Sequence, residues 1–232
     1  LGGTAAVGVP VETVLKAKLG SANVTRLAGA GRYETARTIA AECVRVLGTG
    51  YDGTAFVATG LNFPDALGAS PLAAANGWPI YLVGPTGADA TLVGAMRADG
   101  VEKALVLGGT GVVSDTVKNG LAAGIPATVE RLFGANRYAT ACVVATYGVN
   151  HAGLGWDRLA IATGQNFPDA LAGGVLQGTS GSVMLLTPSA TLDTGVRAIL
   201  VANKGVIHEV RFLGGTGAVS AAVRTAVTQA LK

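Results

Sequence analysis

Charged residues are scarce in this chain of 232 residues, and aromatic residues are scarcer still. Asp, Glu, Lys and Arg make up 13% of the sequence, and Phe, Trp and Tyr only 5%. No run of five basic residues occurs, which excludes a basic tail for nucleic acid, and so few aromatics disfavour base-stacking surfaces. No apolar stretch reaches the roughly 18 to 20 residues of a membrane span. The net charge of +3 permits an anionic partner without demanding one.

Cysteine and histidine are too few to suggest a disulfide framework or a metal site. The chain has two of each: Cys43, Cys142, His151 and His208. None has a counterpart of its own type when the two halves of the chain are aligned, and no Cys-Xaa-Xaa-Cys motif is present. We expect the cysteines to be small apolar helix residues without a disulfide, and we expect no metal and no cofactor.

What the chain does contain is an internal duplication. The block Ala-Thr-Gly-Xaa-Asn-Phe-Pro-Asp-Ala-Leu spans residues 58–67 and 162–171, and only its fourth residue differs between the copies. Two further blocks recur in step: Leu-Gly-Gly-Thr at Leu1, Leu107 and Leu213, and Arg-Leu-Xaa-Gly followed by Arg-Tyr at Arg26 and Arg131. Self-similarity at a fixed spacing indicates repeated structural units, so function is to be sought in what the copies share.

The repeat predicts two units and a fragment of a third. We place unit 1 at residues 23–124 and unit 2 at residues 125–232. Residues 1–22 match the terminal helix of a preceding, truncated unit, and the opening at Leu1 inside a repeated motif predicts a piece of a longer protein.

Strand and helix patterns alternate four times within each unit. In unit 1 we expect strands at 24–28, 54–59, 79–83 and 103–107, with helices at 33–47, about 62–76, 90–98 and 114–123. The strands are apolar without clean alternation, which is typical of strands covered on both faces. Alternation at this spacing predicts an α/β fold of mainly parallel sheets with helices on their faces.

The Asn-Phe-Pro-Asp block carries three candidate positions in each copy. They are Asn62 and Asn166, Phe63 and Phe167, and Asp65 and Asp169. We expect the asparagines to cap a helix and the phenylalanines to form a hydrophobic staple. The aspartates either accept hydrogen bonds from the helix start or face a ligand. With one acid per copy, a paired-carboxylate hydrolase is not supported.

Four arginines follow strand ends, where open α/β sheets bind ligands: Arg26, Arg32, Arg131 and Arg137. Their guanidinium groups suit phosphate or uronate oxygens, and the alternative is that they pair with the aspartates of the same block. The Gly-Gly-Thr turns precede helices, so they either contact an anion or simply permit a tight turn. Neither copy has a Ser-His-Asp set, an activated Cys or a nucleophile elbow, and we predict no enzyme.

Four runs in fixed order resemble the cell-wall-binding repeat 2 family over essentially the whole chain. They are Arg-Leu-Ala-Gly-Ala-Gly-Arg-Tyr-Glu-Thr-Ala from Arg26, Ala-Thr-Gly-Leu-Asn-Phe-Pro-Asp-Ala-Leu from Ala58, Pro-Ile-Tyr-Leu-Val from Pro79 and Val-Leu-Gly-Gly-Thr-Gly-Val-Val-Ser from Val106. The resemblance implies tandem Rossmann-like or Toprim-like three-layer units with pseudo-symmetric packing, three units forming a triangular pseudo-trimer. Gly31 departs from the Asp or Asn usual in the family, whereas Asn136 keeps it.

The resemblance also implies a function. Family members are secreted proteins of Gram-positive surfaces, such as surface-layer proteins and wall amidases, whose repeats anchor an attached effector noncovalently to anionic wall polymer. The family's recurrent positions carry over to Arg26, Arg32, Asn62 and Asp65, and to Arg131, Arg137, Asn166 and Asp169. A third repeat or a homo-oligomer is an expected partner. The rival hypotheses are an enzyme acting on a phosphorylated or glycosyl substrate and a purely structural module.

Overall fold

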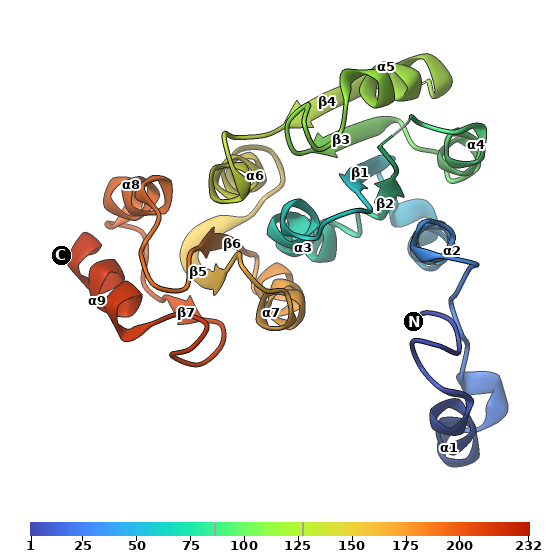
Figure 1. The fold of residues 1–232 in the computed structure, drawn as a ribbon, viewed down its shortest axis with the longest axis horizontal. Helices are drawn as coiled ribbons and strands as arrows, with labels where there is room; N and C mark the ends of the chain where they lie inside the picture. Colours follow the sequence, from blue (N-terminus) through green and yellow to red (C-terminus); the bar gives the residue numbers. More distant parts are fainter. Residues whose placement is uncertain (86, 127) are drawn as a thin grey trace.

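The computed structural model describes residues 1–85, 87–126 and 128–232 and contains two parallel sheets (Figure 1). The strands are β1 (Thr54–Thr59), β2 (Ile80–Val83), β3 (Lys103–Leu107), β4 (Thr128–Leu132), β5 (Gly155–Thr163), β6 (Ser182–Thr187) and β7 (Arg211–Phe212). The first sheet has the order β2-β1-β3-β4 and the second β6-β5-β7. All five strand pairings described are parallel, which confirms the predicted α/β class.

A helix follows each strand, as the sequence pattern predicts. The helices are α1 (Val9–Leu19), α2 (Arg32–Leu47), α3 (Pro64–Asn76), α4 (Ala90–Ala98), α5 (Asp115–Gly124), α6 (Arg137–His151), α7 (Pro168–Thr179), α8 (Thr194–Asn203) and α9 (Ala221–Ala230), with short 3-10 turns at Ser21–Asn23 and Gly48–Gly50. Within the described part of the chain, no helix has the length and apolar character needed to cross a membrane.

Helices cover both faces of the first sheet. Ala55 and Val57 of β1 share a core with α2, α4 and α5, whereas Phe56 and Ala58 face α3 and α6. Successive side chains of a strand point to opposite faces, so both sets must be apolar to be buried. This three-layer arrangement explains why the strand sequences are apolar without alternation.

The two repeats share structure across their boundary. The strand β4 opens the second repeat, yet it pairs with β3 of the first, with Arg131 in register with Val106. Helix α3 of the first repeat packs against α6, α7 and β6 of the second (Figure 1). The first sheet therefore continues past the boundary that the sequence repeat predicts at residues 124 and 125.

The strand expected at residues 24–28 is absent from the structure, and that prediction is wrong. Its counterpart is β4, which forms a ladder with β3. In the described part of the chain, the segment makes one backbone hydrogen bond to a distant part of the chain, in which the Gly2 N–H donates to the Leu27 carbonyl at 2.8 Å. A strand needs a neighbouring strand to satisfy its backbone groups, and one hydrogen bond does not supply a ladder.

The helix expected within residues 1–22 is present as α1, but it lies apart from both sheets (Figure 1). None of its residues is buried. Val11 and Leu15 are exposed, whereas their counterparts in α5, Val117 and Leu121, are buried. Helix α1 therefore keeps the apolar positions of a core helix without the strands that such a helix covers.

Candidate functional site at the junction of the two repeats

The repeated blocks meet in a cavity between the two repeats, which we call the junction cavity. Its volume is about 300 Å³. The lining residues that matter below are Asn62, Asp65, Gly109, Val112, Asn136 and Arg137. The start of α3, the turn after β3 and the start of α6 supply them, so neither repeat forms this cavity alone.

Asp65 is the acid of the junction cavity. Its carboxylate lies so close to the turn after β3 that a Cβ on Gly108 would stand 2.5 Å from Oδ2, and Gly108 has a φ of 93°. Burial raises the pKa of Asp65, and the positive charge of Arg137 acts in the opposite direction. No described residue donates a hydrogen bond to this carboxylate. Asp65 is thus a partly buried acceptor without a donor.

The equivalent acid of the second repeat, Asp169, has a different environment. It contacts the corresponding turn at Gly214 but is exposed to solvent. The loop that leads into α6 lines the junction cavity together with Asp65, which is half-buried there. Two identical sequence blocks therefore carry acids with different accessibility.

We predict that Asp65→Asn stabilises the protein at pH 7 relative to the unaltered chain. Because burial raises the folded-state pKa of Asp65, its ionised form destabilises the fold above that pKa, and stability increases as pH falls towards the unfolded pKa near 3.9. The advantage of the variant should therefore disappear towards about pH 3. Urea unfolding between pH 3 and 7 measures it, with exposed Asp169→Asn as the control. A difference in unfolding free energy between Asp65→Asn and the unaltered chain that stays the same across this pH range would contradict the raised pKa of Asp65.

Arg32 and Arg137 occupy equivalent positions and make the same backbone contact. Nη1 of Arg137 donates to the Gly164 carbonyl at 2.7 Å, and Nη1 of Arg32 donates to the Gly60 carbonyl at 2.6 Å. Each thereby ties the start of one helix to the loop after the next strand. Arg137 also lines the junction cavity, whereas Arg32 borders an apolar hollow of about 660 Å³ beside α3.

Arg26 and Arg131 have internal partners. Arg131 donates to the Gly108 carbonyl at 2.7 Å and to Asp115 at 3.0 Å, and its side chain is 9% exposed. Arg26 contacts Glu12 at 2.7 Å and the carbonyl of the equivalent glycine in its own turn. Both arginines hold a Gly-Gly-Thr turn in place. The alternative that they pair with the aspartates of the Asn-Phe-Pro-Asp block is wrong.

The expected asparagine caps of α3 and α7 are wrong, whereas the phenylalanine staple stays a prediction. The helices begin so that Phe63 and Phe167 are the cap residues, with no side-chain cap bond. Asn62 and Asn166 lie one position earlier, and each side chain accepts only from the next N–H, at 2.9 Å. The two phenylalanine rings contact each other across the repeats, with centroids 5.4 Å apart.

Asn136 is a site residue that was not among the predicted ligand contacts. Its Oδ1 caps α6 by accepting from the N–H groups of Tyr138 and Ala139. Gly31 at the equivalent position provides no side-chain cap. The asparagine was visible in the sequence, but its place beside Asp65 depends on how the repeats pack.

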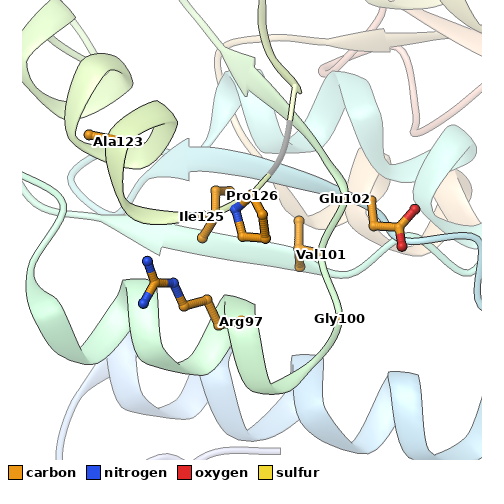
Figure 2. Close-up of a pocket in the computed structure, with 7 residues that line it drawn as sticks. All are labelled: Arg97, Gly100, Val101, Glu102, Ala123, Ile125 and Pro126. Carbon is orange, nitrogen blue, oxygen red and sulfur yellow. The ribbon is translucent and has the colours of Figure 1, made fainter.

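Another hollow, of about 610 Å³, lies where strands of the first sheet begin, at the opposite edge from the junction cavity. Its charged residues are Arg97 and Glu102. Figure 2 shows these two side chains pointing away from each other. None of the predicted ligand residues lines this hollow, so the junction cavity is the better candidate.

Cys43 and Cys142 lie in α2 and α6 as free thiols, as their sequence context predicts. Burial raises the pKa of the Cys142 thiol to about 12, so it is protonated at neutral pH. Among the described residues no group of three His, Cys, Asp or Glu side chains is placed to hold a metal ion.

These features define a tandem α/β repeat protein with a polar cavity between its repeats. The sequence profile of Cell wall binding domain 2 (CWB2) matches residues 26–118 and 131–224, and the chain belongs to this family. Its two repeats are cell-wall-binding units, and the chain is associated with the cell wall or surface.

Two curated relatives come from Bacillus subtilis (strain 168). The chain is 30% identical over 223 residues to N-acetylmuramoyl-L-alanine amidase LytC, covering 96% of this chain and 41% of that protein. It is 28% identical over 227 residues to the Amidase enhancer, covering 98% of this chain and 29% of that protein. The chain thus spans less than half the length of these relatives.

Two solved structures share the fold. Cwp8 from Clostridium difficile superposes with a TM-score of 0.81 at 26% identity, covering 99% of this chain and 37% of that chain. Cwp6 from the same organism gives a TM-score of 0.77 at 20% identity, covering 88% and 31%.

Proposed function

We propose that the chain is a noncatalytic wall anchor that binds an anionic wall polymer and thereby displays an attached effector domain. The observation that carries the proposal is the junction cavity, where Arg137 stands at the start of α6 with one Nη1 contact to the backbone. A guanidinium at a helix N-terminus favours phosphate or carboxylate groups. Asp65 and Arg137 are the charged residues of the cavity lining, so it offers one acid and no second proton-transfer group.

The eight predicted ligand residues take different parts in this proposal. Asn62, Asp65 and Arg137 contact the polymer in the junction cavity. Arg32, Asn166 and Asp169 hold the equivalent positions for junctions with further units. Arg26 and Arg131 keep the glycine turns in place, and through them the shape of the site.

A third repeat, in the same protein or in a second chain, is part of the proposal. Leu67 and Leu72 of α3 are 5% and 0% exposed because the second repeat covers them. Their counterparts in α7, Leu171 and Leu176, are 58% and 50% exposed. A patch of this kind marks an interaction surface, and pseudo-symmetry favours another repeat as its occupant.

We predict that the chain is retained on purified wall sacculi and is released as salt rises, because counterions screen exposed charge contacts. Arg137→Gln should weaken retention roughly tenfold, since a charge-assisted hydrogen bond contributes about 1.5 kcal/mol. A pull-down across a sodium chloride series measures both effects. The matched control is Arg45→Gln, which removes the same charge from the far end of α2, where Arg45 is 69% exposed.

Equal losses for the two variants would show a diffuse charge effect and count against the junction cavity. Retention that ignores salt would count against an anionic ligand. Release of soluble fragments from the sacculi, abolished by Asp169→Asn, would instead support the rival enzyme hypothesis.

A further inference from the structure

The junction cavity has an apolar rim in addition to its polar lining. Phe133 follows β4 and is 54% exposed, and Val112 lines the cavity. Phe133 stands next to the cavity wall, because a Cβ on Gly109 would lie 3.6 Å from its Cδ2. Val112 is itself 41% exposed, so two exposed apolar side chains lie together at this cavity.

The fold that the repeats share does not require large apolar side chains at the positions of Phe133 and Val112. Aligning the repeats places Ala28 opposite Phe133 and Ala6 opposite Val112. The neighbouring Leu132 supplies the buried contact at the end of β4, and Phe133 is not part of a core cluster. The larger apolar residues are therefore special to the junction between the two complete repeats.

The polar side of the cavity lacks hydrogen-bond donors for its acid. No described group donates to the Asp65 carboxylate, and Asn62 and Asn136 use their Oδ1 atoms within the chain. At neutral pH a phosphodiester group has hydrogen-bond acceptors but no donor. It would therefore pair with Arg137 and be repelled by the Asp65 carboxylate. Sugar hydroxyls both donate and accept, so they suit the carboxylate and the two amide groups together.

We propose that the junction cavity binds a pyranose ring of the polymer, not an anionic group alone. The C–H face of the ring lies on Phe133 and Val112, its hydroxyls donate to Asp65, and an adjacent anionic substituent reaches Arg137. This inference rests on the proposed wall-anchoring function and names the repeating unit that the anchor recognises. Burial of an aromatic anchor supplies affinity that salt does not screen.

The test compares two forms of anionic polymer extracted from Bacillus subtilis (strain 168) walls. One form is intact, and the other is oxidised with periodate and reduced with borohydride, which opens rings bearing vicinal hydroxyls and keeps the anionic groups. We expect Phe133→Ala to weaken binding of the intact polymer roughly tenfold, and Phe133→Tyr to retain it. Opened polymer should bind the unaltered chain and Phe133→Ala equally. Val201→Ala, an exposed apolar change in α8, should bind like the unaltered chain.

Each outcome decides between the two proposals. If the unaltered chain binds and Phe133→Ala binds equally well, the ring contact is overturned and wall anchoring stands. A loss that is the same on intact and opened polymer also overturns the ring contact, because it shows an effect on charge contacts or folding. If the unaltered chain binds neither form, both proposals fail. Should Phe133→Ala not fold, Val112→Ala on the same two polymers gives the same decision, with a smaller expected loss.

Discussion

Gly178→Ala is expected to destabilise the protein by about 2 kcal/mol, although alanine is the better helix former. The reason is the close approach of α7 to α3. A Cβ on Gly178 would stand 2.5 Å from the Pro71 carbonyl oxygen and 2.7 Å from the Ala74 Cβ. The obstructing atoms include backbone of the other repeat, so the helices must separate. Urea unfolding measures the loss, and wall binding should fall with it because the junction cavity needs both repeats.

Gly94→Ala is the matched control for this prediction. Gly94 lies inside α4, and nothing is within 4 Å of the position its Cβ would take. The same substitution should therefore stabilise the protein by up to about 1 kcal/mol. Opposite signs for the two variants support a close junction between the repeats. If Gly178→Ala were as stable as Gly94→Ala, the packing of α3 on α7 described above would be incorrect.

Arg131→Ala is expected to cost about 3 kcal/mol of unfolding free energy. Nη1 donates to the Gly108 carbonyl at 2.7 Å and to the Val113 carbonyl at 2.8 Å, and the side chain is 9% exposed. Removing it leaves partly buried carbonyl groups without a donor, and each unsatisfied group costs about 1 to 3 kcal/mol. Thermal and urea unfolding give the value.

The control is Arg45→Ala, because Arg45 is exposed and pairs only with Glu42 one turn away. Such surface pairs contribute little, so we expect a change within about 0.5 kcal/mol. Wall binding should be measured at a temperature where both variants are folded. An Arg131→Ala protein of unchanged stability that no longer binds wall would assign Arg131 to the ligand and not to the turn.

Most of the fold followed from local sequence patterns. Apolar strands, Gly-rich turns and alternating helices predicted parallel sheets covered on both faces, and the described strands agree. The strand expected at residues 24–28 was wrong, although its sequence resembles that of β4. Strand formation depends on a pairing partner. Strand β4 pairs with β3 of the preceding repeat, whereas residues 24–28 make a single backbone hydrogen bond to the turn at Gly2.

The candidate site was predictable as a set of residue types but not as an arrangement. Asp65 and Asp169 stand in identical blocks, and nothing local distinguishes them. Packing of the second repeat covers Asp65 and brings Arg137 near it, whereas Asp169 is exposed. Arg131 looked equivalent in chemistry to Arg137, yet its position within the sheet turns it towards the backbone of the glycine turn.

The sequence by itself determined the repeat, the family and, apart from the strand expected at residues 24–28, the order of strands and helices. These features depend on spacing and on which residues are apolar. Only the tertiary structure decided which copies of the repeated residues meet. That choice depends on contacts between segments far apart in the chain, such as α3 with α7 and β3 with β4. Identical blocks therefore acquire different burial, charge neighbours and accessibility.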